Sequence, residues 1–185
     1  MKKEPKLWEV LSSDYLHKEP WCTLRRDSVK VSNGAIIPDY YILEYPNWIN
    51  VIAITKEGKF LFIYQYRHGL QQYFYELTAG VCDATDQSPL ETAQRELLEE
   101  TGYGNGNWEQ WSILSANPST HTNLCYSFLA TNVEKISEQH LDAAEDLEVV
   151  ELDLEEVKQL LFDDKIKQSL HAAALWKYMA VNKLI

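Results

Sequence analysis

The stretch AGVCDATDQSPLETAQRELLEETGY, residues 79–103, is the most informative part of the sequence because it predicts a helix with two well-defined ends. The motif SPLE at residues 88–91 is a capping box with proline at the first helical position, and Gly102 is a typical helix stop. The residues that share one face at about 100° per residue are Leu90, Ala93, Leu97 and Thr101. We therefore expect a helix over residues 89–101 that buries this face against a sheet.

A second sector of this helix carries three carboxylates within about one turn, at Glu96, Glu99 and Glu100. Like charges at this spacing repel one another and destabilise a helix, and Arg95 can relieve part of the repulsion by pairing with Glu99 at i+4. A hard divalent cation such as Mg²⁺, which prefers oxygen ligands, would relieve more. The loop before the helix could add the backbone carbonyl of Ala79. The alternative is a solvated helix face with i,i+4 ion pairs, and this pattern alone fits both.

The same stretch resembles the signature of the Nudix hydrolases, G-x5-E-x7-R-E-U-x-E-E-x-G-U, in which U is a bulky apolar residue. Gly80 stands at its start, and RELLEETGY at residues 95–103 matches its second half. The resemblance extends from about Trp48 to the C-terminus. It implies an α/β/α sandwich and metal-dependent hydrolysis of a pyrophosphate, with Mg²⁺ as the expected ion and Mn²⁺ as the other candidate.

The first half of the signature departs from the family pattern. Counted back from Arg95, the position of the first glutamate falls on Gln87, and six residues rather than five separate it from Gly80. One carboxylate that supports the metal ligands is missing there, and Asp83 and Asp86 are the candidates to replace it. The departure favours an alternative function, a nucleotide-sugar sensor with little or no hydrolysis. The intact R-E-x-x-E-E core favours an active enzyme.

Two flanking segments are similar to the ADP-ribose pyrophosphatase branch of the family. IYQYRHGLQQYFYELTAG, residues 63–80, resembles its Q-Y-R and E-L-P-A-G segments, with Thr78 in place of the usual proline. Pro118 lies 16 residues after Gly102, where that branch commonly has a proline. The resemblance implies hydrolysis of ADP-ribose or a related nucleoside diphosphate sugar to a nucleoside monophosphate and a sugar phosphate.

The resemblance also implies a role for each candidate residue. Metal ligands are expected from Glu96, Glu99, Glu100 and the carbonyl of Ala79, with Arg95 holding the carboxylates in place. A general base must come from elsewhere, because metal-bound carboxylates are poor proton acceptors. Glu145, in an acidic loop before the last strand, is the first candidate and Glu148 the second. The residues expected to contact substrate are Arg67, Glu76, Pro118, Trp21 and Arg25.

The order of the remaining elements predicts an α+β fold with a mixed sheet between helices. Strands are expected before and after the first helix, and two helices over residues 154–162 and 164–182 end the chain. Pro46 and Asn47 mark a boundary between an N-terminal β-module, residues 1–47, and the main domain, residues 48–185. The module contains a hairpin turn at Asn33-Gly34. In the resembled branch this module forms a homodimer and contributes to the base pocket of the other subunit.

Composition limits the classes of partner. The net charge of −11, from 17 Lys and Arg against 28 Asp and Glu, opposes binding to nucleic acid or anionic membranes. No apolar run approaches the roughly 18 residues that span a bilayer. Three widely spaced cysteines without a C-x-x-C pair fit free thiols in a reducing compartment. We therefore expect a cytoplasmic protein.

Overall fold

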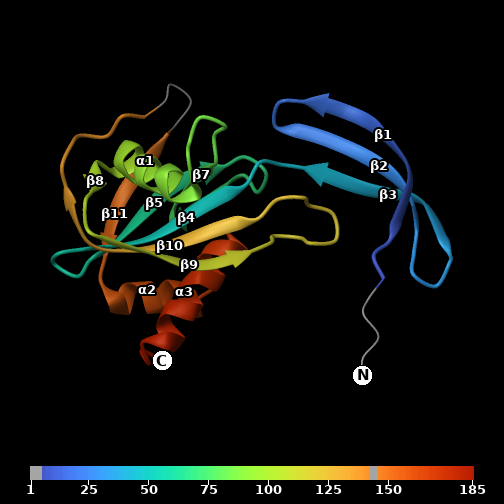
Figure 1. The fold of residues 1–185 in the computed structure, drawn as a ribbon. Helices are drawn as coiled ribbons and strands as arrows, with labels where there is room; N and C mark the ends of the chain where they lie inside the picture. Colours follow the sequence, from blue (N-terminus) through green and yellow to red (C-terminus); the bar gives the residue numbers. More distant parts are fainter. Residues whose placement is uncertain (1–5, 142–145) are drawn as a thin grey trace. The chain divides into compact units, whose positions relative to one another are not determined.

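The computed structural model describes residues 6–141 and 146–185, which form two compact units. The first unit contains the chain up to Pro46 together with Asn117–Asn123, and the second contains Asn47–Ala116 and Leu124–Ile185. Figure 1 labels the strands of the first unit β1–β3. The loop of residues 117–123 belongs to the first unit because it bonds to the last of these strands, where Leu43 N donates to Thr120 O at 2.8 Å.

The first unit is a three-stranded antiparallel sheet in the order β1-β2-β3. Its strands are β1 (Glu9–Glu19), β2 (Cys22–Lys30) and β3 (Ile36–Glu44). The predicted turn at Asn33-Gly34 joins β2 to β3, and Gly34 has φ 93°, which favours glycine. Strand β1 was not predicted, because its polar and apolar residues do not alternate regularly and every one of its residues is exposed.

The second unit is built on an eight-stranded mixed sheet. Its main order is β11-β5-β4-β10-β8, with β6 on β5, β7 on β4 and β9 on β10. Strands β4 and β10 are parallel, and every other pair in this sheet is antiparallel. The strands are β4 (Trp48–Thr55), β5 (Phe60–Arg67), β6 (Gln72–Glu76), β7 (Thr78–Val81), β8 (Tyr103–Gly104), β9 (Asn107–Leu114), β10 (Cys125–Lys135) and β11 (Leu147–Leu152).

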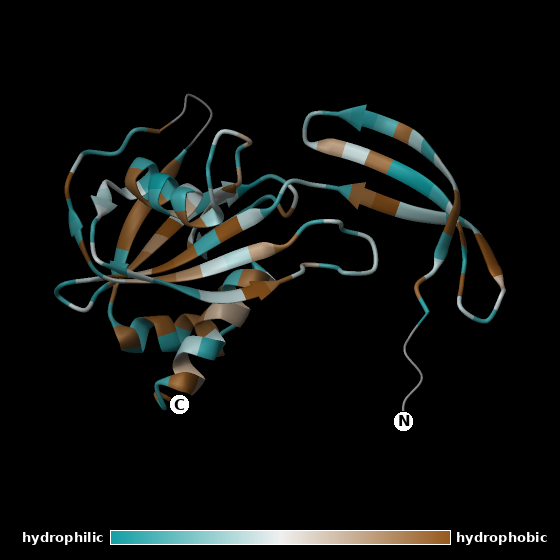
Figure 2. Cartoon of the chain, in the orientation of Figure 1, coloured by the Kyte–Doolittle hydropathy of each residue, from teal (hydrophilic) through white to brown (hydrophobic). Residues whose placement is uncertain are grey.

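Helices cover both faces of this sheet, which confirms the predicted α+β sandwich (Figure 1). Helix α1 (Pro89–Thr101) packs over one core layer through Ala93 and Leu97. Helices α2 (Leu154–Phe162) and α3 (Ser169–Val181) close a second layer. Strand β4 contributes to both layers, and its sequence WINVIAIT is accordingly mostly apolar, with Asn50 and Thr55 as buried polar exceptions. In Figure 2 brown segments predominate in the centre of this sheet, interrupted by paler and teal ones.

Helix α1 has the ends that the sequence predicts. Ser88 Oγ accepts a hydrogen bond from Glu91 N at 3.2 Å, and Gly102 ends the helix with φ 75° while its N–H donates to Leu98 O. The buried face is shifted from the predicted one. Leu90 is 37% exposed, whereas Thr92 and Glu100 are buried. The shift brings the carboxylate of Glu100 toward the protein interior.

The last helix starts later than predicted, at Ser169 instead of residue 164. Asp164 has φ 52°, a left-handed conformation that interrupts a right-handed helix, and the buried Ile166 anchors the segment between α2 and α3. Gln168 then caps α3, because its side chain accepts a hydrogen bond from Leu170 N. Among the described residues, no helix is both long and apolar enough to cross a membrane.

Candidate active site

The carboxylate of Glu96 lies in a space left open by a glycine. Strand β7 pairs Gly80 with Ile49 of β4, and α1 packs over β7. A Cβ atom added to Gly80 would lie 2.3 Å from Cδ and Oε1 of Glu96. The absence of a side chain therefore lets a helix carboxylate approach the strand that carries the backbone carbonyl of Ala79.

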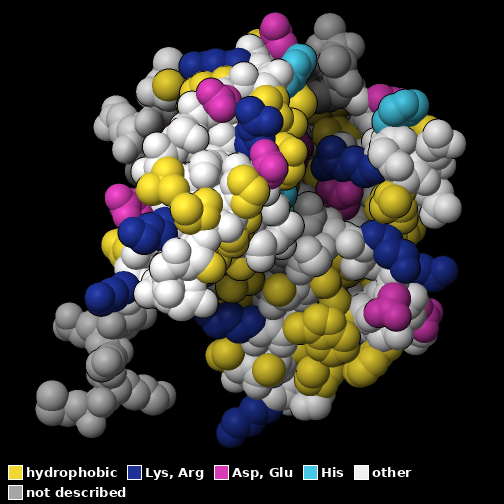
Figure 3. Space-filling view, turned by 90° about the vertical axis from the view of Figure 1, so that its right-hand side faces the viewer, with side chains coloured by type: hydrophobic (Ala, Val, Ile, Leu, Met, Phe, Trp, Pro, Cys, Tyr) yellow, Lys and Arg dark blue, Asp and Glu magenta, His cyan; other side chains and the backbone are white. Residues whose placement is uncertain are grey.

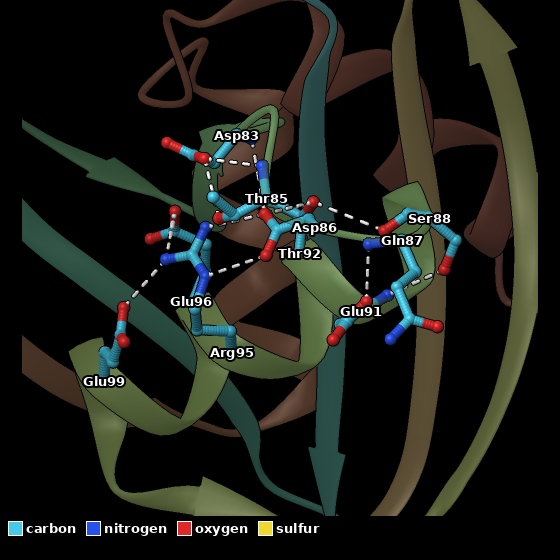
Figure 4. Close-up of polar contacts among 10 residues, drawn as sticks. All are labelled: Asp83, Thr85, Asp86, Gln87, Ser88, Glu91, Thr92, Arg95, Glu96 and Glu99. Carbon is cyan, nitrogen blue, oxygen red and sulfur yellow. Dashed lines mark hydrogen bonds and ion pairs between the residues drawn. The ribbon is translucent and has the colours of Figure 1, made fainter.

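Arg95 connects a carboxylate of the loop before α1 to two carboxylates on the second half of α1 (Figure 4). Its guanidinium pairs with Glu96 Oε1 at 3.1 Å and with Glu99 Oε2 at 2.9 Å, which confirms the i+4 pairing expected from the sequence. It also donates to Asp86 from Nη2, at 3.0 Å from Oδ2, and from Nε, at 3.4 Å from Oδ1. Hydrogen bonding to Asp86, followed by the neighbouring Glu96 charge, raises the pKa of Arg95, so this group stays cationic.

Glu100 brings a third carboxylate to the inner side of the helix. It is only 6% exposed, and its charge is close enough to Arg67 to help raise the pKa of that guanidinium. The donor set of α1 is therefore made of carboxylate oxygens, the ligand type that Mg²⁺ and Mn²⁺ prefer. Among the described residues no three His, Cys, Asp or Glu side chains are already gathered as a metal site. The carboxylate oxygens and the open space above Gly80 fit a divalent ion on which these carboxylates would converge.

Arg67 and Glu76 form an ion pair beside a cavity of about 520 Å³. Arg67 lies at the end of β5 and Glu76 at the end of β6. The guanidinium donates to the carboxylate from Nε, at 2.9 Å from Oε1, and from Nη2, at 2.6 Å from Oε2. Glu76 is 4% exposed, whereas the Arg67 side chain is 48% exposed. The hydrogen bonds to Glu76 raise the pKa of Arg67. Ala79 and Gly80 also line this cavity, which places it next to the carboxylates of α1.

His171 of α3 lines the same cavity and was missed by the sequence analysis. Its Nδ1 accepts a hydrogen bond from Leu77 N at 3.2 Å, so the proton of the neutral imidazole is on Nε2. Burial lowers the pKa of His171 to about 4, despite the opposing attraction of the Glu76 charge. No periodicity or spacing distinguished this histidine within the apolar run SLHAAALWKYMAV, because its role depends on a strand distant in the chain.

The lowered pKa of His171 predicts an acid-dependent loss of stability. The unfolded chain binds a proton at this histidine below about pH 6.5, whereas the folded chain binds it only near pH 4. Stability is therefore fully present above pH 6.5 and decreases as the pH falls toward 4, by about 3 kcal/mol from this group. Urea unfolding at pH 7 and pH 4.5 measures the effect. In His171→Asn, whose amide oxygen can still accept from Leu77 N, this part of the loss should vanish. An identical pH dependence in both proteins would contradict the assignment.

Three predicted substrate residues belong to the first unit. Trp21 lies in the β1–β2 turn with its side chain 81% exposed, and Pro118 is an exposed residue of the loop that joins this unit. Arg25 is already paired, with Asp27 at 2.9 Å and with Glu44. Glu145, the predicted general base, lies outside the described residues, and Glu148 lies on β11.

Two family models match this chain and agree with its fold. Residues 45–173 match the family model described as the NUDIX domain, and residues 8–43 match that of the nucleoside diphosphate sugar hydrolase N-terminal domain. The chain therefore belongs to the Nudix family of hydrolases. Together the two matches identify a Nudix pyrophosphatase of the class that hydrolyses nucleoside diphosphate sugars.

The chain is also similar to named proteins over most of its length. It is 31% identical to an ADP-ribose pyrophosphatase of Mycobacterium tuberculosis over 140 residues. This alignment covers 75% of this chain and 67% of the relative. The chain is 30% identical over 145 residues to an ADP-ribose pyrophosphatase of Bacillus subtilis, covering 78% and 77%. The solved structure of an ADP compounds hydrolase shares the fold, with a TM-score of 0.84 at 23% identity over 98% of this chain and 97% of that one.

Proposed function

We propose that this chain hydrolyses ADP-ribose to AMP and ribose 5-phosphate with Mg²⁺ as its metal ion, and that Mn²⁺ can replace it. The observation that carries the proposal is the Glu96 carboxylate in the space above Gly80, next to a cavity lined by Arg67 and Glu76. Two relatives that are ADP-ribose pyrophosphatases support the choice of substrate. Nudix hydrolases generally require a divalent metal ion.

The metal ligands in this proposal are Glu96, Glu99, Glu100 and the carbonyl of Ala79. A bound Mg²⁺ supplies charge neutralisation at the phosphates and orients or acidifies an attacking water. Arg95 holds Glu96 and Glu99 through the ion pairs described above. Glu145 serves as the general base, since the ligand carboxylates are poor proton acceptors; this assignment rests on the resemblance to the family.

Arg67 and Glu76 provide the substrate contacts on the cavity side. Only two of the five N–H groups of the Arg67 guanidinium enter the bonds to Glu76, so the others can bind diphosphate oxygens. Glu76 keeps the guanidinium in position and can accept a hydrogen bond from a ribose hydroxyl. Trp21, Arg25 and Pro118 are assigned to the base and phosphate pocket by resemblance, and their contribution depends on assembly.

We further propose a homodimer formed through the first unit, in a reducing, cytoplasmic compartment. Large hydrophobic side chains are exposed along this unit, at Val10, Leu11, Tyr15, Leu16, Ile36 and Tyr41. Exposed hydrophobic patches that lie between charged side chains are also visible on the face in Figure 3. A second copy could cover such residues. The three free cysteines support the choice of a reducing compartment. Light scattering that gave the mass of one chain would exclude the dimer.

A substrate panel tests the proposed function. The purified protein is incubated with ADP-ribose, GDP-mannose, other sugar nucleotides and dinucleotides in the presence of Mg²⁺, and products are separated by chromatography. We expect AMP and ribose 5-phosphate from ADP-ribose at the highest kcat/KM, and no products after addition of a chelator. A higher kcat/KM for another member would keep the hydrolase and overturn the substrate. Binding without turnover across the panel would favour the sensor.

A further inference from the structure

Three hydrogen bonds fix the carboxylate of Asp86 besides its bond from Arg95 Nε. Its Oδ2 accepts from Arg95 Nη2 at 3.0 Å, from Thr92 Oγ1 at 2.8 Å and from Asp83 N at 3.3 Å. The side chain is only 8% exposed, although it comes from a surface loop. The Arg95 guanidinium, followed by the Thr92 hydroxyl, lowers the pKa of Asp86. This carboxylate is therefore an anion directed at the guanidinium that also holds Glu96 and Glu99.

Gln87 does not contact the Arg95 guanidinium in the way that Asp86 does. It is the residue that falls on the glutamate position when the signature is counted back from Arg95. It is exposed, and its backbone N–H donates to Glu91 Oε2 at 2.6 Å at the start of α1 (Figure 4). Counted forward from Gly80, five residues lead instead to Asp86. The additional residue of this loop therefore lies between Asp86 and Arg95, and a carboxylate is present at the forward-counted position.

We propose that Asp86 is the positioning residue of the metal site and that Gln87 has no part in it; this rests on the proposed function. If Glu96 and Glu99 on α1 were its only partners, the Arg95 guanidinium could rotate between them and turn away from the loop before the helix. Asp86 engages Nε and Nη2 on one edge, which leaves Nη1 to Glu96 and Glu99. Asp86 thus fixes the plane of Arg95, and Arg95 fixes the two carboxylates. Partners of this kind typically change metal affinity or activity by about 10- to 100-fold.

The matched variants Asp86→Asn and Gln87→Ala, one residue apart in the same loop, test the proposal. Mn²⁺ affinity is measured by calorimetry and electron paramagnetic resonance, and kcat and KM are measured on the best substrate of the panel. For Asp86→Asn we expect Mn²⁺ binding and kcat each to fall by about 10- to 100-fold, with KM within about threefold of wild type. For Gln87→Ala both should stay within about twofold. Asp86→Glu, which keeps the charge, should recover part of both losses.

The outcomes separate this proposal from the proposed function. A purely structural role would lower the unfolding temperature of Asp86→Asn while its folded protein kept wild-type Mn²⁺ affinity and kcat, and that result would overturn the proposal. So would losses in Gln87→Ala equal to those in Asp86→Asn. If wild type hydrolyses no panel member, the proposed function fails, whereas the Mn²⁺ affinities of the two variants still decide the role of Asp86.

Discussion

Replacement of Glu100 by glutamine is expected to lower kcat by about 10³-fold while leaving the fold intact or slightly more stable. Glutamine has nearly the same shape, so the buried side chain at 6% exposure can keep its packing. The substitution removes an anionic oxygen from the proposed ligand set, and metal-borne charge stabilisation is worth several kcal/mol in a transition state. It also removes one of three like charges at the end of α1, and the relief of this repulsion in the metal-free protein offsets the loss of the attraction between Glu100 and Arg67.

Glu100→Gln is thus expected to weaken metal binding and catalysis without lowering the stability of the metal-free protein. Thermal unfolding with and without Mg²⁺ separates the two effects. Thermal unfolding without metal should occur at the same or a higher temperature in Glu100→Gln, whereas the rise in unfolding temperature on addition of Mg²⁺ should be smaller than in wild type. Glu57→Gln is the matched control, since Glu57 lies in an exposed turn between β4 and β5. Wild-type turnover in Glu100→Gln, with an unchanged response to Mg²⁺, would remove Glu100 from the ligand set.

Local signals in the sequence predicted the parts of this protein that depend on neighbours in the chain. The ends of α1 depend on Ser88 and Gly102, and both cap the helix as predicted. The second bond of the predicted capping box differs, because the Glu91 carboxylate accepts from Gln87 N and not from Ser88 N. The pair Arg95–Glu99 likewise lies one turn apart on one helix. The start of α3 was predicted too early because a single left-handed residue, Asp164, interrupts a segment whose composition is otherwise compatible with a helix.

Two features that depend on the path of the chain in space were not determined by the sequence. His171 reaches the cavity only because α3 packs under the strands, where its Nδ1 accepts from Leu77 N. The choice between Asp83 and Asp86 as the partner of Arg95 depends on the path of a loop. In the structure Asp83 caps this loop through Thr85, with bonds of 2.8 and 2.7 Å, and Asp86 alone of the two turns to the guanidinium. Counting along the signature could not show where the additional residue lies.

A methyl group at position 80 is expected to abolish most activity without unfolding the protein. In Gly80→Ala the new Cβ would overlap the Glu96 carboxylate, at 2.3 Å from Cδ and Oε1. Because the overlapped atoms are the end of a flexible side chain, moving the Glu96 side chain costs less energy than moving β7. We therefore expect Glu96 to move and β7 to stay in place. A displacement of about 1 Å in a positioned group can cost about 100-fold in rate. We therefore expect kcat to fall by about 100-fold with little change in unfolding temperature.

Gly69→Ala is the control for this substitution, because a Cβ at Gly69 would meet nothing within 4 Å. It should retain wild-type kcat. Mn²⁺ affinity gives a second readout, and it should fall in Gly80→Ala by about 10-fold or more if Glu96 is a ligand. Unchanged kcat and Mn²⁺ affinity in Gly80→Ala would show that the approach of Glu96 to β7 is only packing. A loss of activity with unchanged Mn²⁺ affinity would instead indicate that the glycine is needed for substrate access to the cavity and that Glu96 is dispensable for metal binding.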